Sequence, residues 1–340
     1  MTTPRILFFA DAGPAIGGGH VMRCLTLAQA LMARGAECAF AAPPAAMRLL
    51  DTFAPDAIER LLLPDGTPSR LAAPIADLAR TWRALGAVVD HYGFGPGEEA
   101  MVRTGVHRLL VLDDLKRGHL CDLVLDSNLD RTAGDYPGVE SLTGPAYALV
   151  RPDFAALRPQ ALARRAEVEP RRLLIALGLT DVGGITARVV EALLPGLGDL
   201  RVDIVLGQGA PSLAALAPLA SRDSRLTLHV DTSEMAALTA AADIAIGAGG
   251  SSVWERCCLG LPTLTLVLAD NQRSAVSSLV ARGAAAALEA DNPAFDKSLV
   301  RGIGELLSDA GGLKRMSLAA SAICDGAGAA RTARRLRAIL

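Results

Sequence analysis

The sequence predicts an α/β protein made of two Rossmann-like, doubly wound domains that face a cleft. Three observations lead to this prediction. The chain has 340 residues, more than one core comfortably organises, and 51% of them are hydrophobic, so each half can bury a core of its own. Short apolar runs without polar alternation are separated by longer amphipathic stretches along the whole chain. This pattern is typical of parallel sheets that helices cover on both faces.

The expected strands form two sets. In the first half they are Ile6–Ala10, Ala87–Asp90, Arg108–Leu112 and Leu123–Leu125, with weaker candidates at Glu37–Ala41 and Ala57–Leu63. In the second half they are Arg172–Leu177, Arg201–Leu206, Leu226–Val230, Ile244–Ile246 and Thr263–Leu268. Amphipathic helices are expected between the strands, for example at Val21–Arg34 and Arg273–Arg282.

The segment Arg151–Pro170 is rich in proline and charge, and it is the best candidate for a linker. We therefore expect an N-terminal Rossmann-like domain over residues 1–155 and a C-terminal Rossmann-like domain over 165–325. A basic helix over 326–340, with no strand after it, is expected to end the chain.

Composition excludes several classes of protein. The net charge is -2 and aromatic residues make up 4%, so no basic or base-stacking surface for nucleic acid is expected. The first apolar run is too short for a signal peptide, and no stretch reaches the ~18 apolar residues of a membrane span. The six cysteines form no C-x-x-C pair, and Cys24 and Cys258 lie in apolar stretches. We expect a reduced, cytoplasmic protein without membrane contact.

Polar residues follow the predicted strands, where parallel sheets bind their ligands. In the first half these residues are Asp11, the run Asp90-His91-Tyr92, the pair Asp113-Asp114, and Asp126 with Asn128. They suit a polar cleft, but Asp and Asn also cap helices and form turns, so each of them has a purely structural alternative.

The first glycine motif, Gly17-Gly18-Gly19-His20, follows the first strand and opens a helix. Its glycines allow close backbone approach to a ligand, and the start of a helix favours anions. The spacing departs from that of a nicotinamide-binding fingerprint. The helix dipole is expected to disfavour a charged His20, leaving a neutral ring that accepts a proton from water. The alternative is a tight turn with a histidine that caps the loop.

The second glycine motif, Gly249-Gly250-Ser251-Ser252, again lies between a strand and a helix. It is expected to hold a diphosphate, with Glu255 one turn later accepting hydrogen bonds from ribose hydroxyls. The structural alternative is that Ser252 and Glu255 form an S-x-x-E capping box. Two such loops, one in each domain, predict that the ligand is a nucleotide diphosphate linked to a second group.

These motifs resemble the UDP-sugar hydrolases of the pseudaminic acid pathway. The resemblance rests on Asp11 to Leu25 with its glycine run, and on the stretch Gly247 to Pro262 with its Trp-Glu-Arg-Cys-Cys run. Between and after them follow Asp90-His91-Tyr92, Leu112-Asp113-Asp114, Tyr147 to Phe154, and Ala269-Asp270-Asn271-Gln272. It covers roughly residues 5 to 275. One departure is Gly178-Leu179-Thr180-Asp181, where the family usually has a glycine pair, which leaves the role of that loop open.

The resemblance implies a fold shared with the B-type glycosyltransferases. It also implies metal-independent hydrolysis, without a cofactor, of UDP-2,4-diacetamido-2,4,6-trideoxy-β-L-altropyranose to the free sugar and UDP. It makes His20 the catalytic residue and gives the loop with Glu255 to UDP. The expected substrate-binding residues are Asp11, Gly17, Gly18, Gly19, Arg23, Tyr92, Gly249, Gly250, Ser251, Ser252, Glu255, Asn271 and Gln272.

Other functions stay open at this point. A UDP-sugar glycosyltransferase would use His20 on an acceptor hydroxyl, and a related UDP-diacetamido sugar could be the substrate of a hydrolase. A non-catalytic binding module would keep the second loop but would not need His20. Metal-assisted hydrolysis through Asp113-Asp114 is disfavoured, because adjacent residues of a strand point to opposite faces.

Overall fold

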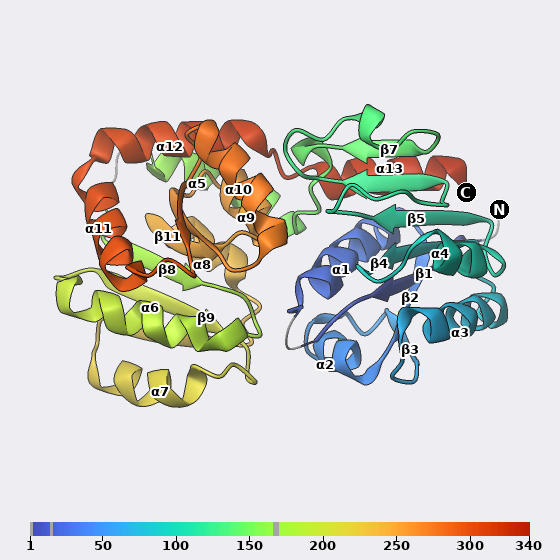
Figure 1. Cartoon of the computed structure of the whole chain (residues 1–340), viewed down its shortest axis with the longest axis horizontal. Coiled ribbons are helices and arrows are strands. Elements are labelled where there is room, and N and C mark those ends of the chain that lie inside the picture. Colours follow the sequence, from blue (N-terminus) through green and yellow to red (C-terminus); the bar gives the residue numbers. More distant parts are fainter. Residues whose placement is uncertain (1–2, 14–15, 166–169) are drawn as a thin grey trace. The chain divides into compact units, whose positions relative to one another are not determined.

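The computed structural model describes residues 3–13, 16–165 and 170–340. It divides into two compact units (Figure 1). The N-terminal unit comprises Met1–Val150 and Ala327–Leu340, and the C-terminal unit comprises Arg151–Gly326. Each unit has one parallel sheet with helices on both faces, so the predicted pair of doubly wound α/β domains is confirmed.

The sheet of the N-terminal unit has seven strands in the order β3-β2-β1-β4-β5-β6-β7. Its strands are β1 (Arg5–Ala10), β2 (Glu37–Ala42), β3 (Glu59–Leu62), β4 (Gly86–Asp90), β5 (Arg108–Leu112), β6 (Leu123–Asp126) and β7 (Glu140–Thr143). The helices are α1 (Gly19–Met32), α2 (Pro44–Phe53), α3 (Pro68–Thr81), α4 (Pro96–Arg103) and α13 (Gly328–Ile339), with short 3₁₀ helices at Ala133–Asp135 and Pro145–Tyr147.

The sheet of the C-terminal unit has six strands in the order β10-β9-β8-β11-β12-β13. Its strands are β8 (Arg172–Ala176), β9 (Arg201–Leu206), β10 (Leu226–Val230), β11 (Ile244–Ala248), β12 (Thr263–Val267) and β13 (Ala286–Glu289). The helices are α5 (Pro152–Arg165), α6 (Ile185–Leu193), α7 (Leu213–Arg222), α8 (Met235–Ala241), α9 (Ser252–Cys258), α10 (Asp270–Ala281), α11 (Phe295–Ser308) and α12 (Ala310–Ile323), with 3₁₀ helices at Val182–Gly184 and Leu194–Gly196.

Alternating side chains build the core on both faces of the N-terminal sheet. On β1, Ile6 and Phe8 belong to the core that includes Leu27 of α1, whereas Leu7 and Phe9 belong to the core formed with α3. All five residues Ile6–Ala10 are buried. This explains why the sequence shows an unbroken apolar run here rather than polar alternation.

The order of the strands places a switch point in each sheet. In the N-terminal unit β2 and β3 lie on one side of β1, and β4 to β7 lie on the other. In the C-terminal unit the corresponding neighbours are β8 and β11. The loops after these strands diverge at the carboxyl edge, which is where open α/β sheets bind ligands. The first glycine motif follows β1 and the second follows β11, so both lie at a switch point.

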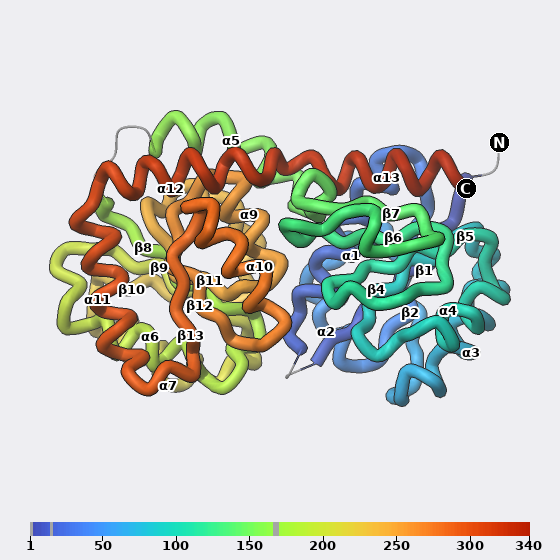
Figure 2. Tube along the Cα trace, turned by 45° about the horizontal axis from the view of Figure 1, so that its top comes forward, coloured from blue at the N-terminus to red at the C-terminus, as the bar shows by residue number. Residues whose placement is uncertain are grey.

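The C-terminal helix α13 completes the N-terminal unit. The chain runs from α12 into α13, which packs against α1 (Figure 2). Ala329, Ala333 and Leu336 are buried in the same core as Leu27 and Leu31 of α1. The predicted basic helix therefore exists, and its apolar side covers a helix that carries the first glycine motif.

The prediction of a linker at Arg151–Pro170 is wrong for most of that segment. Residues Pro152–Arg165 form α5, which belongs to the C-terminal unit and packs on α8. Pro152 stands at the first position of the helix, where proline is well tolerated. Residues 166–169, the other part of the expected linker, lie outside the described residues.

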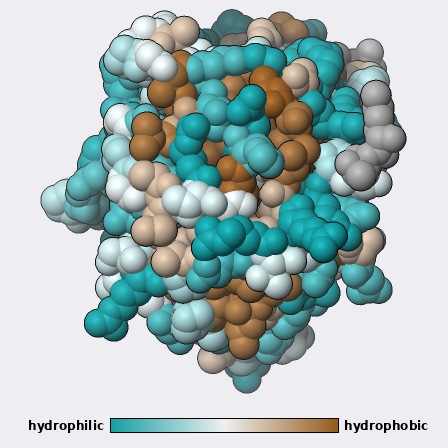
Figure 3. All heavy atoms as spheres, turned by 90° about the vertical axis from the view of Figure 1, so that its right-hand side faces the viewer, coloured by the Kyte–Doolittle hydropathy of each residue, from teal (hydrophilic) through white to brown (hydrophobic). Residues whose placement is uncertain are grey.

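Exposed apolar side chains of the N-terminal unit lie on several separate elements. They include Leu62 on β3, Met101 on α4, and Leu115 and Leu120 in the loop after β5. Figure 3 shows one face of the molecule, where hydrophobic residues form patches among hydrophilic ones. Within the described part of the chain, no helix is long and apolar enough to span a membrane.

Candidate active site

His20 lies in the first turn of α1, close to the carboxyl end of β4. Its side chain is buried, with a residue exposure of 6%. Its Nδ1 atom lies 3.2 Å from Asp90 Oδ1 and 3.3 Å from the backbone oxygen of Asp90. Because both neighbours are acceptors, the proton of a neutral ring is assigned to Nδ1. Nε2 then carries the lone pair, and it makes no hydrogen bond to the residues that the structure describes.

Asp90 changes the electrostatic expectation for His20. The sequence prediction considered only the helix dipole, which disfavours imidazolium. The structure adds a buried carboxylate beside Nδ1. This contact with Asp90 orients the imidazole ring.

Arg23 connects Asp90 to a second carboxylate. Its Nε and Nη2 atoms donate to Asp90 at 2.5 and 2.7 Å, and its Nη1 donates to Asp114 at 3.0 Å. Burial alone would raise the pKa of Asp90, but Arg23 and then His20 outweigh it, and the pKa is lowered. The guanidinium of Arg23 thus binds two carboxylates of the protein itself. The sequence prediction had instead expected Arg23 to bind the substrate.

Tyr92 completes a ring of five side chains that includes His20. Its hydroxyl donates to Asp114 Oδ2 at 3.1 Å, and its ring meets the imidazole edge-on at a centroid distance of 4.6 Å. Burial, followed by Asp114, raises the pKa of Tyr92, which keeps the phenol protonated. The ring His20–Asp90–Arg23–Asp114–Tyr92 joins α1 to the ends of β4 and β5.

Asp11 follows β1 and faces a second histidine. Its Oδ2 lies 3.5 Å from Nε2 of His91, and its backbone N–H donates to the Asp90 carbonyl at 2.9 Å. The His91 ring stacks on Phe9 with a centroid distance of 5.5 Å. Burial lowers the pKa of His91 although Asp11 opposes this effect. Asp11 and His91 therefore add a polar pair at the same end of the sheet.

The three glycines of the first motif have different roles. Gly17 has a φ of +86°, which favours glycine, and forms an isolated bridge with Gly13. Gly18 is the N-cap of α1 and accepts from the N–H of Met22 at 3.1 Å, and Gly19 is the first helical residue. Only Gly17 of these three needs the conformational freedom of glycine.

A second ionic cluster consists of the side chains of His119, Glu99, Asp113 and Arg117. His119 Nδ1 is 2.6 Å from Glu99 Oε1, and its Nε2 is 3.5 Å from Asp113 Oδ2. Burial opposes the charge of His119, but Asp113 and Glu99 outweigh it and raise its pKa to about 9. Asp113 also accepts from Arg117 Nε at 2.9 Å, and Arg117 donates to the carbonyl oxygens of Tyr92 and Phe94. The cluster therefore fixes the loop that carries Tyr92.

The remaining acidic strand ends have structural partners. Asp113 and Asp126 both accept from the Tyr136 hydroxyl, at 3.0 and 2.7 Å, while Asp126 also accepts from the N–H of Asn128. Asp113 and Asp114 have different partners, as expected for adjacent residues of one extended segment. Among the described residues, no group of three or more His, Cys, Asp or Glu side chains is arranged to hold a metal ion.

The second glycine loop follows β11 in the C-terminal unit. A Cβ atom on Gly249 would lie 2.6 Å from Val276 Cγ2 and 3.1 Å from Gln272, so close packing of α10 explains this glycine. Gly250 is exposed and has no neighbour within 4 Å of an added Cβ. Ser251 is the N-cap of α9 and Ser252 its first residue. The outer side of this loop is thus open while its inner side is packed.

The capping box expected from Ser252 and Glu255 is wrong. No side chain caps α9, because Ser252 already lies inside the helix, where its Oγ accepts from Arg256 Nη1 at 2.9 Å. Glu255 instead accepts two hydrogen bonds from Arg151, at 2.7 and 3.1 Å. Its side chain is 14% exposed. Glu255 is therefore held in a fixed orientation by a residue that the sequence analysis did not single out.

The other predicted residues of the C-terminal unit lie at the same edge of its sheet. Asn271 is exposed in the first turn of α10. Gln272 Oε1 accepts from the N–H of Leu268 at 3.0 Å and so joins the end of β12 to α10. In the loop after β8, Asp181 is buried and accepts from Thr186 and Ser212, while Gly178 has a φ of +112°. Hydrogen bonds to the buried Asp181 therefore hold that loop in its conformation.

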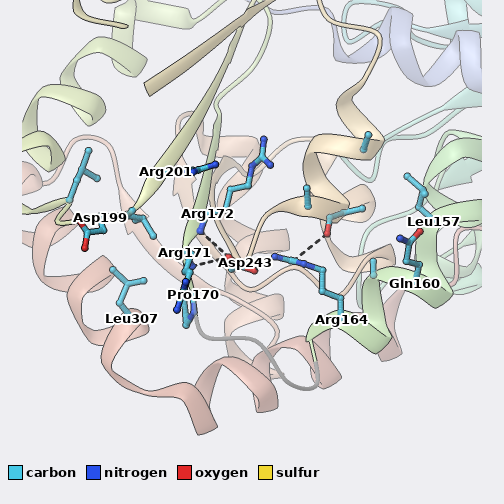
Figure 4. A pocket seen from close by; sticks show the side chains of 16 residues that line it. Leu157, Gln160, Arg164, Pro170, Arg171, Arg172, Asp199, Arg201, Asp243 and Leu307 are labelled. Atoms are coloured by element: carbon cyan, nitrogen blue, oxygen red, sulfur yellow. Dashed lines mark hydrogen bonds and ion pairs between the residues drawn. The ribbon is translucent and has the colours of Figure 1, made fainter. Parts of the chain in front are cut away.

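A cavity of about 1410 Å³ in the C-terminal unit lies away from these loops. Arg172 and Arg201 begin β8 and β9, and Asp243 precedes β11, so the cavity opens at the amino edge of the sheet. Figure 4 shows Arg164 turned toward Asp243, which also accepts a hydrogen bond from the backbone N–H of Arg172 at 2.8 Å. Because parallel sheets bind nucleotides at the opposite edge, this cavity does not mark the nucleotide site.

Sequence reasoning missed the partners of the predicted residues more than the residues themselves. Asp90 and Asp114 were noted as strand ends, but not as partners of His20 and Arg23. Arg151 and Arg256 were present in the quoted motifs without an individual role. A polar residue next to a predicted site residue was the available signal for Asp90 and Arg256. No local pattern indicated the contact of Arg151 with Glu255, because 104 positions separate the two residues along the chain.

Comparison with known proteins supports the resemblance. No family model matches the chain. It is 24% identical over 286 residues to the UDP-2,4-diacetamido-2,4,6-trideoxy-beta-L-altropyranose hydrolase of Campylobacter jejuni, covering 82% of this chain and 97% of that protein. It is 26% identical over 167 residues to the spore coat polysaccharide biosynthesis protein SpsG of Bacillus subtilis, covering 48% of each.

Solved structures share the fold of this chain. MurG of Acinetobacter baumannii matches with a TM-score of 0.69 and 18% identity, covering 98% of this chain and 99% of MurG. The spinosyn rhamnosyltransferase SpnG in complex with thymidine diphosphate matches with a TM-score of 0.64 and 19% identity, covering 98% and 100%. These likenesses show the fold. The chain is thus a relative of the UDP-diacetamido-trideoxy-altropyranose hydrolase of C. jejuni, with the two-domain fold of the B-type glycosyltransferases.

Proposed function

We propose that this protein hydrolyses UDP-2,4-diacetamido-2,4,6-trideoxy-β-L-altropyranose, in pseudaminic acid biosynthesis, to the free sugar and UDP. The similarity to the C. jejuni hydrolase over 97% of that protein supports a UDP-sugar substrate. One observation carries the assignment of a general base: the pairing of His20 Nδ1 with Asp90 at 3.2 Å, which leaves Nε2 as the basic atom. A base held in one tautomer by a buried carboxylate suits proton removal from water.

In this proposal the two units divide the reaction. His20 Nε2 takes a proton from a water molecule, and the water oxygen attacks the anomeric carbon. The bond between that carbon and the diphosphate oxygen breaks, so that UDP leaves as an anion. Asp90 stabilises the imidazolium that forms, and Arg23 holds Asp90 ionised. Arg23 therefore acts as a positioning residue.

The sugar-binding residues belong to the N-terminal unit. Asp11 and Tyr92 lie at the ends of β1 and β4, on the same edge as His20. Their oxygen atoms provide hydrogen-bond partners for the hydroxyl and acetamido groups of the sugar. The backbone of Gly17, Gly18 and Gly19 allows the ligand to approach closely, because no side chain projects from it.

The C-terminal unit holds UDP in this proposal. The loop Gly249–Ser252 receives the diphosphate, and Glu255 accepts hydrogen bonds from the ribose hydroxyls. Each carboxylate oxygen of Glu255 accepts one bond from Arg151, which leaves lone pairs free for the ribose. Gln272 supports the neighbouring loop after β12, and Asn271 precedes it in the first turn of α10.

The test is to incubate the purified protein with the UDP-sugar and to follow UDP by chromatography, without any acceptor. The wild type is expected to release UDP, and His20→Asn is expected to lose ~10²–10⁴-fold in rate, the usual contribution of a general base. UDP affinity should stay close to that of the wild type in His20→Asn. Near-normal turnover by this variant would remove His20 from the mechanism.

A UDP-sugar glycosyltransferase is the second candidate, because the protein shares its fold with MurG and SpnG. It would use the same UDP loop, with His20 acting on an acceptor hydroxyl instead of water. UDP release that appears only after an acceptor is added would favour this function. A third candidate is hydrolysis of a related UDP-diacetamido sugar, which parallel incubations with several such sugars would detect.

A further inference from the structure

Arg256 is a buried cation that has no carboxylate partner among the residues that the structure describes. Its residue exposure is 4%. No carboxylate among the described residues lies within ion-pair distance of its guanidinium, and burial lowers its pKa to about 10. Arg23 and Arg151, in contrast, are paired with Asp90 and Glu255. A buried charge without a counter-charge is unfavourable, so its retention calls for an explanation.

The guanidinium of Arg256 lies directly under the second glycine loop. Nη2 donates to the carbonyl of Ala248 at 2.7 Å, and Nη1 donates to Ser252 Oγ at 2.9 Å. A Cβ atom on Gly247 would lie only 2.4 Å from the Cζ of Arg256. The absence of a side chain at Gly247 therefore leaves room for the guanidinium at its observed position.

The Ser252 hydroxyl connects the buried charge to the open side of the loop. Because Ser252 Oγ accepts from Arg256, its own proton is directed to another acceptor. Ser252 is partly exposed, and the adjacent Gly250 is exposed. A hydroxyl that accepts from a guanidinium is a stronger donor, since hydrogen bonds in a chain polarise one another. An anion bound by Ser252 would supply the counter-charge that Arg256 lacks.

We propose that Arg256 is the buried cation of a phosphate-binding subsite and acts on the ligand through the Ser252 hydroxyl. The ligand class is a diphosphate. Its identification as UDP rests on the proposed function, whereas the subsite itself does not. Arg256 is a positioning residue here, because Ser252 and the loop backbone touch the ligand.

The experiment measures binding of UDP, uridine and inorganic pyrophosphate by isothermal titration calorimetry. Arg256→Gln and Ser252→Ala are each expected to weaken UDP binding roughly 10–100-fold, the value of one charge-assisted hydrogen bond. Uridine affinity should change less than about threefold. The double variant should bind UDP no more weakly than the weaker single variant, because both changes interrupt one hydrogen-bond chain. Arg256→Lys, which keeps the charge, should lose less than Arg256→Gln.

Arg165 provides a matched control. It is a partly buried arginine of the C-terminal unit with its pKa lowered by burial to about 10, and it donates to backbone carbonyls of Ala161, Leu259, Thr239 and Ala242. Arg165→Gln is expected to lower the melting temperature and to leave UDP affinity unchanged. Equal losses of UDP affinity in Arg165→Gln and Arg256→Gln would overturn the proposal.

The design separates this inference from the proposed function. If the wild type binds pyrophosphate but not UDP, the proposed function fails and the subsite stands. If it binds UDP and the Ser252→Ala and Arg256→Gln variants bind UDP equally well, the subsite fails alone. Parallel losses for UDP and uridine would mean that Arg256 only supports the loop, which also overturns the inference. Ser252→Ala keeps the test valid if Arg256→Gln does not fold.

Discussion

The two buried ion pairs that His119 forms with Glu99 and Asp113 predict a specific pH dependence of stability. The pKa of His119 is about 9 in the folded protein, against an ordinary value of 6.5. At about 1.4 kcal/mol per pH unit, this interval corresponds to about 3 kcal/mol of free energy of unfolding. Because the folded-state pKa is the higher one, this stabilisation is complete below pH 6.5. It is lost as the pH rises to about 9.

The assay is urea unfolding of the wild type and His119→Gln at pH values from 6 to 10. The free-energy difference between the two proteins should shrink by about 3 kcal/mol between pH 6 and pH 9.5, because only the wild type loses a proton from His119. His107, an exposed histidine outside the cluster, provides the control variant His107→Gln. A difference between wild type and His119→Gln that does not change with pH would refute the assignment of a charged His119.

The remaining predictions concern the proposed reaction. Asp90→Asn should lower the rate roughly 10²–10⁴-fold with little change in UDP affinity, because the histidine loses the carboxylate that orients it; an unchanged rate in steady-state kinetics would contradict that role. Glu255→Ala should weaken UDP binding in calorimetry and destabilise the protein, because Arg151 loses its partner; unchanged UDP affinity would leave Glu255 only a structural role. Activity should survive EDTA, since donors of the protein neutralise the leaving diphosphate; a loss that Mg²⁺ or Mn²⁺ restores would implicate Asp113 and Asp114. In ¹⁸O-water the UDP should stay unlabelled by mass spectrometry, because water attacks carbon; label in its β-phosphate would place the attack at phosphorus.

The strands of both sheets were predictable where they are buried on both faces. β1, β5, β9 and β11 read as apolar runs because helices cover them from both sides. β7 (Glu140–Thr143) and β13 (Ala286–Glu289) were missed, since they are short edge strands with partly exposed residues. β7 has no apolar run, and the run at β13 consists mostly of alanine, which is depleted in strands.

The candidate site shows a similar division. His20 and the glycine loops were found because local spacing identifies a loop between a strand and a helix. The pairing of Asp90 with His20 depends on β1 and β4 being neighbours, and 70 residues separate the two partners along the chain. The capping box failed for a local reason, since α9 begins at Ser252 itself. Local patterns thus located the loops, and only the fold identified the partners.

The position of α13 affects how the N-terminal unit matures during synthesis. Its residues Ala329, Ala333 and Leu336 are synthesised after the whole C-terminal unit, yet they fill a core that begins with Ile6. The N-terminal unit therefore cannot complete its packing when its first 150 residues have emerged. The surface of α1 that α13 covers stays uncovered until α13 itself has emerged. The helix that carries His20 is thus secured only once the C-terminal unit has been synthesised as well.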